Sequence, residues 1–363
     1  MTTSSIRIFA GSLAKQRIAE YGLQAADVAV IPAAAGGPKG LILQKLDQWL
    51  FGSWLPQAPR ERTLIGASIG SWRMAAAACA DPVAGFQRLG DLYCGQTYPE
   101  NPDTDCVTRE ISGMLDQLIG GYEQEILRNP SYHLHILTNR GLRHLQFTNS
   151  LNAEKTAFAR AALANLRGRD HLAAHLERVV FSDQRDTLTW LQTAFDAFST
   201  VFTPLQSGNL RQALLASGTL PLIMNKVSGI PAAPQGQYWD GGIIDYHLAF
   251  PYHRLGQDQL VLYPHFAPYL VPGWLDKALP WRRTHRAPFR DWMQNVILIA
   301  PSNDFLRTLP RGKLPDRKDF SYHGLNHQRR IQDWKIAMSE AERLRDDLIR
   351  FIEKPDPAQI HAL

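Results

Sequence analysis

Short apolar runs and amphipathic segments alternate along most of the chain. The runs are rich in Val, Ile and Leu and predict buried strands at 28–31, 62–65, 132–138, 178–182, 259–263 and 295–300. Segments whose apolar residues recur every three or four positions predict helices at 8–23, 41–50, 83–129, 152–177, 209–217 and 327–353. This alternation favours the α/β class, with a mostly parallel central sheet between two layers of helices in a three-layer α/β/α sandwich.

The chain has 363 residues, enough for one large α/β domain, and shows no internal repeat or low-complexity region. We therefore expect a single domain over residues 1–363, with its core at about 26–263. The remainder, 264–363, is expected to be a C-terminal elaboration that contains the long helix at 327–353. An apolar stripe on this helix should face the core, and it consists of Ile331, Trp334, Met338, Ala341, Leu348 and Ile352.

A Gly-x-Ser-x-Gly sequence follows the strand expected at 62–65 and precedes an alanine-rich helix. Its key residues are Gly66, Ser68 and Gly70, and Ile69 comes directly after the serine. A strand, a tight turn and a helix in this order are typical of a nucleophile elbow, which presents the serine hydroxyl above a sharp turn. Glycines permit such a turn because they lack a Cβ, and the N–H groups that begin the helix favour negative charge nearby. A chance match to so short a motif remains the alternative.

A second glycine-rich turn links the strand at 28–31 to the next helix. It contains Gly36, Gly37 and Gly40, with Lys39 before the last glycine. A loop of this kind exposes backbone N–H groups that bind an anion or an oxyanion, although a plain strand-to-helix turn or a phosphate cradle would use the same residues. Its spacing matches neither of the common glycine-rich nucleotide-binding patterns. Because both turns end parallel strands, we expect them to meet at one edge of the sheet.

A third turn contains Asp240, which stands between aromatic residues and the pair Gly241-Gly242. This pattern predicts a tight turn that holds one carboxylate in place, and a hairpin turn is the alternative because Asp-Gly is a common hairpin signal. Asp245 is interpreted as a capping or solvated residue. His133 and His135 share one face of the strand at 132–138 and are interpreted as half-exposed.

Four short motifs in a fixed order resemble the patatin-like phospholipase family of lipid acyl hydrolases. That family has a Gly-Gly-x-Arg/Lys-Gly oxyanion loop, a Gly-x-Ser-x-Gly elbow, an Ala-Ser-x-x-x-Pro block and an Asp-Gly-Gly/Ala turn. The matching stretches here are 36–40, 66–70, 216–221 and 240–242, and the resemblance covers about residues 26–263. Four ordered motifs are far more specific than any one of them alone.

The resemblance implies a serine–aspartate dyad that needs no histidine, metal or cofactor. Ser68 would attack an ester carbonyl of a phospholipid or another acyl lipid, and Asp240 would act as general base. The N–H groups of Gly36, Gly37 and Ile69 would hold the oxyanion. The supporting residues would be Lys39, Gly40, Gly66, Gly70, Gly241 and Gly242.

Departures from the family pattern leave the shape of the substrate open. Ala35 stands where many members have another glycine, Lys39 replaces the commoner arginine, and neither Asn nor Pro follows the Asp-Gly-Gly turn closely. Lys39 would anchor its loop, lend positive charge near a phosphate head group, or simply be solvated. Two other functions remain open: a catalytically silent protein that binds an acyl chain, and an α/β-hydrolase esterase with a Ser-Asp-His triad. Candidates for its histidine are His323, His327 and His361.

The composition is that of an ordinary globular protein, with 45% hydrophobic and 20% charged residues. The three cysteines, Cys79, Cys94 and Cys106, are too few for a disulfide framework and show no zinc-binding spacing. The first residues lack the pattern of a secretory signal, and no apolar run is long enough to cross a membrane. We therefore expect a cytoplasmic protein, either free or attached peripherally to a membrane.

Basic residues concentrate at 274–318, which holds ten Lys or Arg and four Asp, an excess of six positive charges against +5 for the whole chain. The basic residues are Lys277, Arg282, Arg283, Arg286, Arg290, Arg307, Arg311, Lys313, Arg317 and Lys318. The aromatic residues among them, of a kind found at membrane–water interfaces, are Trp274, Trp281, Phe289 and Trp292. The stretch predicts contact with an anionic membrane surface, or else solvated charges with the tryptophans in the core. The mild total charge does not predict a nucleic-acid partner.

Overall fold

The computed structural model describes residues 4–283 and 289–363. Its strands are β1 (Ile6–Ala10), β2 (Val28–Ala33), β3 (Arg62–Ala67), β4 (Tyr132–Gly141), β5 (Leu176–Ser182), β6 (Thr200–Pro204), β7 (Val227–Ser228), β8 (Gln237–Asp240), β9 (Leu260–Pro264), β10 (Val296–Pro301) and β11 (Ile360–Ala362). Within these described residues, they form one 11-stranded sheet in the order β11-β1-β10-β9-β2-β3-β4-β5-β6, with β8 paired to β4 and β7 paired to β8.

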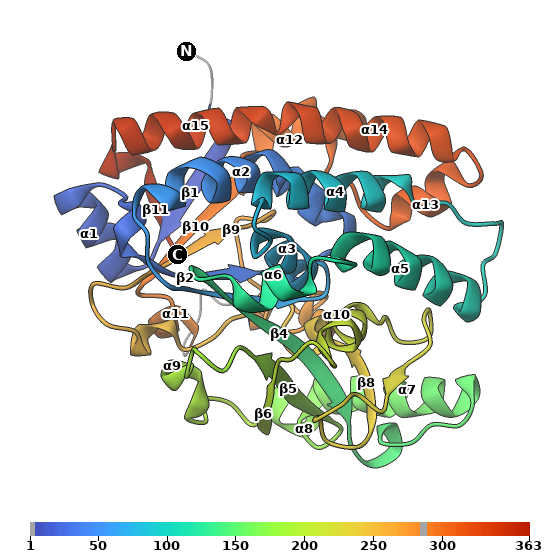
Figure 1. The fold of residues 1–363 in the computed structure, drawn as a ribbon. Coiled ribbons are helices and arrows are strands. Elements are labelled where there is room, and N and C mark those ends of the chain that lie inside the picture. The colour runs from blue at the N-terminus through green and yellow to red at the C-terminus, as the bar shows by residue number, and fades with distance from the viewer. Residues whose placement is uncertain (1–3, 284–288) are drawn as a thin grey trace.

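Helices cover both faces of this sheet, so the fold is the expected three-layer α/β/α sandwich (Figure 1). The helices are α1 (Ser12–Tyr21), α2 (Gln44–Trp49), α3 (Ile69–Ala77), α4 (Pro82–Gly95), α5 (Thr104–Ile119), α6 (Glu123–Arg128), α7 (Leu151–Arg167), α8 (Arg169–Leu172), α9 (Thr189–Gln192), α10 (Leu210–Gly218), α11 (Phe289–Trp292), α12 (Asn303–Thr308), α13 (Lys318–His323), α14 (His327–Glu340) and α15 (Glu342–Glu353). Helices α14 and α15 pack beside α2 at the top of Figure 1, and α7 and α8 lie at the bottom.

The middle of the sheet is parallel, as expected. Strands β10, β9, β2, β3 and β4 run in one direction, whereas β1 and β5 are antiparallel to their inner neighbours. Strands β2, β3, β9 and β10 are buried along their whole length, because helices cover both of their faces. The loops that follow β2 and β3 therefore lie at the same edge of the sheet.

Both ends of the chain contribute to the sheet more than expected. Residues 6–10 form β1, so the helix expected at 8–23 was wrong over residues 8–10, where β10 and β11 pair with the strand on either side. Strand β10 lies inside the sheet, between β1 and β9, and β11 forms its edge. Residues 264–363 thus complete the sheet as well as surrounding it. The helical segment expected at 152–177 also ends early, since β5 begins at Leu176.

The long helix expected at 327–353 is divided into α14 and α15 by Ala341. The ψ of Ala341 is −8°, which interrupts the helical hydrogen bonds and lets α15 pack against both α2 and β1. The apolar stripe faces the core as predicted, with Trp334, Met338, Ala341 and Leu348 buried.

Candidate active site

Ser68 lies in the turn between β3 and α3 in a backbone conformation that is unusual for a residue other than glycine. Its φ is 57° and its ψ is −132°, and such a conformation costs about 1–3 kcal/mol. The chain packs so closely here that neither flanking glycine has room for a Cβ. A Cβ on Gly66 would lie 2.5 Å from the carbonyl carbon of Gly70, and one on Gly70 would lie 2.0 Å from the carbonyl oxygen of Ala33. Both positions therefore require glycine.

Ser68 and Asp240 meet because β3 and β8 share one edge of β4. Strand β3 runs parallel to β4 and pairs with it up to Ala67, opposite Leu137. Strand β8 approaches from the other direction and ends with Asp240 opposite Thr138, the next residue of β4. Since β5 occupies the second edge of β4 at these residues, β8 continues the edge that β3 leaves. The carboxyl ends of β3 and β8 therefore face each other.

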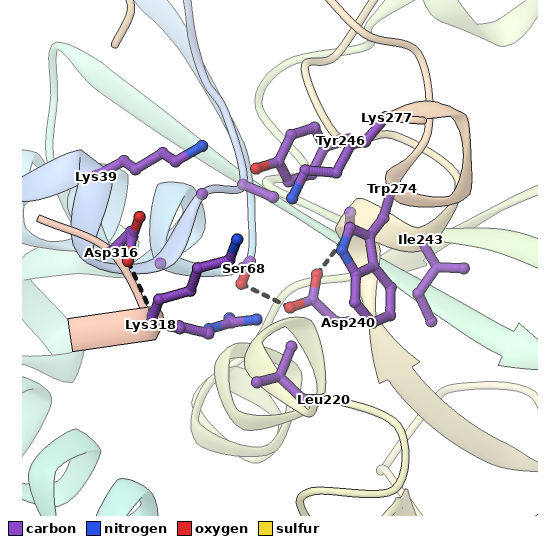
Figure 2. A pocket seen from close by; sticks show the side chains of 15 residues that line it. Lys39, Ser68, Leu220, Asp240, Ile243, Tyr246, Trp274, Lys277, Asp316 and Lys318 are labelled. Atoms are coloured by element: carbon purple, nitrogen blue, oxygen red, sulfur yellow. Dashed lines mark hydrogen bonds between the residues drawn. The ribbon is translucent and has the colours of Figure 1, made fainter. Parts of the chain in front are cut away.

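The two side chains are joined by a short hydrogen bond in a buried position (Figure 2). Ser68 Oγ donates to Asp240 Oδ2 at 2.6 Å, and the N–H of Gly242 donates to Asp240 Oδ1 at 2.7 Å. Ser68 is 4% exposed and Asp240 is 5% exposed. The side-chain amide of Asn139 donates to the carbonyl oxygens of Asp240 and Gly241 at 2.6 and 3.0 Å. Both the carboxylate and the main chain that carries it are thus fixed.

The turn after Asp240 is packed as closely as the serine turn. A Cβ on Gly241 would lie 2.2 Å from the carbonyl oxygen of Leu137. A Cβ on Gly242 would lie 2.6 Å from the Cβ of Ala35. The second contact joins this turn to the glycine loop after β2, so the two loops hold each other in place.

Burial raises the pKa of Asp240 to about 6, although the hydrogen bond from Ser68, the charge of Arg317, the N–H of Gly242 and the charge of Lys277 each lower it. A carboxylate with this pKa is mostly ionised at neutral pH, yet it holds a proton more readily than an ordinary aspartate does. General bases work best when their pKa lies near the working pH. Asp240 is therefore suited to accept a proton from Ser68 and to return it.

Ser217 fixes the main chain of the serine turn, a role that the sequence did not predict. The N–H of Ser68 donates to Ser217 Oγ at 2.9 Å, and Ser217 Oγ donates to the carbonyl oxygen of Leu137 at 2.7 Å. The N–H of Asp240 donates to the carbonyl oxygen of Thr219 at 2.8 Å. The Ala-Ser-x-x-x-Pro block thus supports both turns, and its presence in the resemblance was the signal that could have revealed this role.

Gly36 and Gly37 of the glycine loop after β2 line the same cavity as Ser68. The φ of Gly37 is 58°, a value that favours glycine, and a Cβ on Gly36 would lie 2.5 Å from the ring of Phe266. Among the described residues, no group accepts a hydrogen bond from the N–H of Gly36, of Gly37 or of Ile69 at the start of α3. These three donors are therefore available to an oxygen anion.

Lys39 extends into the cavity and is not fully solvated. Its amine lies 5.5 Å from the ring centre of Phe266, and burial lowers the pKa of Lys39.

Gly40 has more room than the other loop glycines, because a Cβ there would make an ordinary contact of 3.5 Å with Arg73. Arg73 donates to both carboxylate oxygens of Asp47 at 2.9 and 2.8 Å, which ties α3 to α2.

Two cavities meet at Ser68. One has a volume of about 280 Å³, and its lining includes Arg317. The other charged residues of this lining are labelled in Figure 2, and they are Lys39, Asp240, Lys277, Asp316 and Lys318. The other has a volume of about 200 Å³ and is largely apolar, and its lining includes Ile69, Trp72, Ile111, Met114, Leu220 and Phe320. Ser68 and Arg317 line both cavities. We call them the polar cavity and the apolar cavity.

The described part of the basic stretch 274–318 is divided between ion pairs and the polar cavity. Aspartates pair with Arg282, Arg290, Arg307, Arg311 and Lys313. The cavity-lining basic residues, whose position the sequence did not predict, are Lys277, Arg317 and Lys318. Arg283 lies 4.2 Å from the ring centre of Tyr269, and Trp281 is 58% exposed. The partly buried aromatic residues are Trp274, Phe289 and Trp292, and Arg286 lies outside the described residues.

The late histidines that a catalytic triad would use do not line either cavity. His323 lies against Asp333, with 3.4 Å between Nε2 and Oδ2. His361 packs on Phe9, with 5.2 Å between ring centres. In the part of the chain that the structure describes, neither cavity lining contains a histidine, so His327 is also absent from both.

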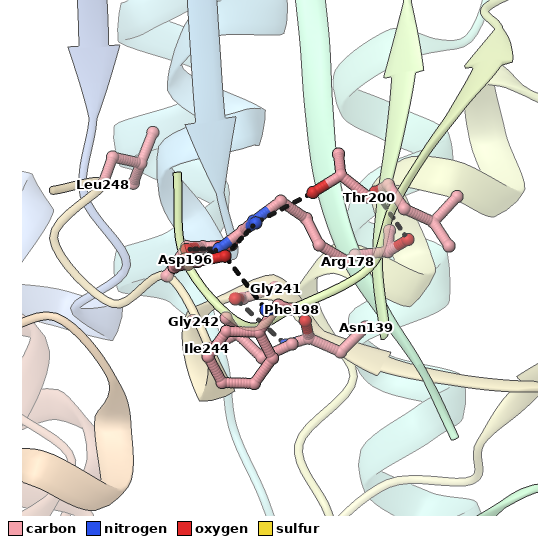
Figure 3. Close-up of polar contacts among 12 residues, drawn as sticks. Asn139, Arg178, Asp196, Phe198, Thr200, Gly241, Gly242, Ile244 and Leu248 are labelled. Atoms are coloured by element: carbon pink, nitrogen blue, oxygen red, sulfur yellow. Dashed lines mark hydrogen bonds and ion pairs between the residues drawn. The ribbon is translucent and has the colours of Figure 1, made fainter. Parts of the chain in front are cut away.

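Three polar residues expected at or near the surface are buried. His133 and His135 on β4 are 3% and 0% exposed, so their interpretation as half-exposed is wrong. The segment after β5 lies against this face, with 3.3 Å between Nε2 of His135 and Oδ2 of Asp186. Asp245 is 4% exposed and accepts two hydrogen bonds from Arg178. Arg178 also donates to Asp196 (Figure 3). Although burial opposes its charge, these two carboxylates raise the pKa of Arg178. The interpretation of Asp245 as a capping or solvated residue is therefore wrong, and its ion pair fixes the segment after the Asp-Gly-Gly turn.

The structure also bears on metal ligands, cysteines and membrane spans. Over residues 4–283 and 289–363, no three His, Cys, Asp or Glu side chains are grouped so that they could hold a metal ion. Cys79, Cys94 and Cys106 are all free thiols. None of the helices in those ranges combines the length and the apolar character needed to cross a membrane.

Comparison with known proteins shows a distant structural similarity. No family model matches the sequence, and no curated protein matches it. Among solved structures, the crystal structure of VipD from Legionella pneumophila shares 14% sequence identity with this chain, at a TM-score of 0.30. The match covers 77% of this chain and 56% of VipD, so the chain spans little more than half the length of that protein. This similarity is too distant to assign a function.

Proposed function

We propose that this protein is a serine hydrolase that cleaves carboxylic ester bonds in acyl lipids, with Ser68 as nucleophile and Asp240 as general base. The observation that carries the proposal is the 2.6 Å hydrogen bond from Ser68 Oγ to the buried carboxylate of Asp240. A serine becomes nucleophilic when a base lies within hydrogen-bonding distance of its hydroxyl. The resemblance of the four ordered motifs to the patatin-like phospholipase family supports the same assignment.

In the proposed reaction, Asp240 takes the proton of Ser68 as Oγ attacks the ester carbonyl. The negative charge on the carbonyl oxygen is held by the N–H groups of Gly36, Gly37 and Ile69. The tetrahedral intermediate expels the alcohol, which receives the proton from Asp240, and an acyl-enzyme remains. Water then attacks the acyl-enzyme while Asp240 takes one of its protons. The carboxylic acid leaves, and the proton returns to Ser68.

The two cavities suggest how such a substrate would lie. The acyl chain would occupy the apolar cavity, whose lining includes Trp72, Ile111 and Met114. The alcohol portion would occupy the polar cavity, on the side of Asp240 and Lys277. The ester bond would then lie at Ser68, where the two cavities meet.

A fluorophosphonate probe followed by mass spectrometry tests the proposal without assuming a substrate. The probe reacts with an activated serine, so wild type should be labelled at Ser68 and should hydrolyse a soluble short-chain ester. Ser68→Ala should lose both properties and remain folded. Ser207→Ala, at an exposed serine, is the matched control and should keep both.

Two results would decide against the proposal. Labelling at another serine would show that Ser68 is not the nucleophile. If a folded wild-type protein is not labelled and hydrolyses no ester, it is a catalytically silent binding protein instead. Replacement of His323, His327 and His361 one at a time examines the triad alternative, because loss of activity in any one of them would point to a histidine base.

A further inference from the structure

Four basic side chains line the polar cavity beside Ser68 without a carboxylate partner. They are Arg317 and the residues Lys39, Lys277 and Lys318, which are labelled in Figure 2. The dashed line from Asp316 in Figure 2 is a hydrogen bond from the main-chain N–H of Lys318, not from its amine. No described Asp or Glu forms an ion pair with any of the four side chains. The two carboxylates of the lining are engaged elsewhere: Asp240 accepts the hydrogen bond from Ser68, and Asp316 pairs with Lys313 at 3.0 Å. The cavity therefore carries an excess of positive charge.

Other basic residues near this cavity form ion pairs with carboxylates, whereas the four lining residues do not. Asp276, whose side chain is fully buried, pairs with Arg169 at 2.6 Å and with Arg282 at 2.8 Å. Asp276 directly precedes Lys277, so its ion pairs with Arg169 and Arg282 fix the segment that carries Lys277. These pairs do not involve Lys277 itself. The unpaired charge of Lys277 is thus a feature of a well-anchored segment.

A second buried aspartate, Asp319, does the same for the segment that carries Arg317. Asp319 pairs with Arg311 and with Lys313, and it accepts a hydrogen bond from Trp334 at 2.9 Å. Arg317 is left without a carboxylate, two residues before this anchor. The fold therefore directs Lys277 and Arg317 into the cavity from two separate, anchored segments.

Arg317 lies next to the reacting groups. A Cβ on Gly37 would lie 3.1 Å from Nε of Arg317, so the guanidinium rests against the glycine loop. Arg317 also lines both cavities, as Ser68 does. Its five N–H donors are thus presented at the junction where the ester bond would lie, in the planar arrangement that suits a phosphate.

The cluster is electrostatically unfavourable without a counter-ion. Burial, followed by the positive charges of Lys39 and Arg317, lowers the pKa of Lys277 to about 8. As a whole residue Lys277 is exposed, and it lines the cavity. Cations held together in a partly closed cavity attract an anion and are stabilised by it.

We propose that Arg317, Lys277 and Lys39 form an anion subsite that binds a phosphate group on the alcohol portion of the substrate. This inference rests on the proposed ester hydrolysis and narrows it to acyl esters whose alcohol carries a phosphate close to the ester bond. A phosphate on a lipid head group and a free phosphate ion share the chemistry that the subsite recognises. Two arms of one experiment separate them.

The first arm compares two soluble short-chain esters, dihexanoyl-glycerol phosphate and dihexanoyl-glycerol, below the concentrations at which they aggregate. Wild type should prefer the phosphate ester in kcat/KM. Arg317→Gln and Lys277→Gln should each reduce this preference by about tenfold, mainly through KM, because a charge-assisted contact to phosphate is lost. Arg307→Gln removes one surface charge outside the cavity, where the side chain is 74% exposed, and should keep the preference.

The second arm measures binding without catalysis. Inorganic phosphate is titrated into Ser68→Ala in a calorimeter, and the affinity should fall about tenfold when Arg317→Gln is added. This arm remains decisive if neither ester is hydrolysed, so failure of the proposed function and failure of the subsite are distinguishable. In one outcome, Arg317→Gln weakens phosphate binding in the Ser68→Ala protein, but wild type shows no preference between the two esters. This outcome would assign the subsite to free phosphate and overturn its role in substrate choice. The subsite would be overturned if Arg317→Gln reduced kcat/KM equally for both esters. It would also be overturned if Arg317→Gln left the affinity for phosphate unchanged.

Discussion

Replacing Asp240 with Asn separates the role of this residue in the reaction from the loss of folding stability caused by burying its charge. Asp240→Asn keeps the size of the side chain, and its amide oxygen can still accept the N–H of Gly242, which Oδ1 now accepts at 2.7 Å. An amide is not basic enough to take the proton of Ser68. We therefore expect turnover to fall by at least about a hundredfold, while the protein remains folded and becomes more stable.

The expected gain in stability follows from the pKa of Asp240, which burial raises from 3.8 to about 6. Because this pKa is higher in the folded protein than in the unfolded chain, wild type loses stability as the pH rises from about 4 to about 6. The cost approaches about 3 kcal/mol at neutral pH, since each pKa unit is worth about 1.4 kcal/mol. The variant lacks this ionisation, so its advantage over wild type should grow by about 2 kcal/mol between about pH 4 and about pH 7.

Equilibrium urea denaturation at several pH values measures this difference directly. Asp291→Asn, at an aspartate whose side chain is 61% exposed, controls for the general effect of removing one negative charge. If the difference in the free energy of unfolding between Asp240→Asn and wild type does not change across this pH range, ionisation of the buried carboxylate does not destabilise the folded protein. If Asp240→Asn retains turnover within about tenfold of wild type, Asp240 is not the general base.

Two further predictions concern pH dependence and surface binding. For an ester that carries a phosphate, kcat/KM should rise as Asp240 ionises near its pKa of about 6 and fall as Lys277 loses its proton near about 8. A pH–rate profile checks this, and Lys277→Gln should lose the alkaline limb while keeping the acid one; an absent acid limb would contradict the role of Asp240. We also propose that the exposed Trp281 and the neighbouring Arg283 contact anionic membranes, so the protein should sediment with anionic vesicles at low salt and be released by salt. Trp281→Ala/Arg283→Ala should bind more weakly, because each basic residue at such a surface contributes about 1 kcal/mol. Equal sedimentation of wild type with neutral and anionic vesicles would refute the electrostatic attraction to an anionic surface.

Local sequence was sufficient to predict most elements that carry the candidate site. The run at 62–65 contains the β-branched residues Thr63 and Ile65, and it lies in β3, which is buried along its whole length. Gly66 and Gly70 predicted the sharp turn at Ser68, and the contacts that exclude a Cβ there explain why. Elements of this kind depend on the preferences of neighbouring residues, which the sequence displays directly.

Elements whose form depends on distant partners were predicted less well. Residues 6–10 have a pattern that also suits a helix, and they form β1 because strands near residues 300 and 360 pair with them. The break at Ala341 likewise reflects the different surfaces on which α14 and α15 pack. Pairing and packing between residues far apart in the sequence override weak local preferences.

The order of the motifs, the tight turns at Ser68 and Asp240 and the glycine-rich loop after β2 are local features that follow from the amino-acid sequence alone. Tertiary packing, in contrast, places β3 and β8 end to end on β4, which brings the serine and the aspartate within 2.6 Å. It also decided that Lys277 and Arg317 line the polar cavity, whereas other basic residues of the same stretch are paired with buried aspartates. The reason is physical: a motif specifies local backbone geometry, but the partner of a charge depends on which segments the packed sheet and helices bring beside it.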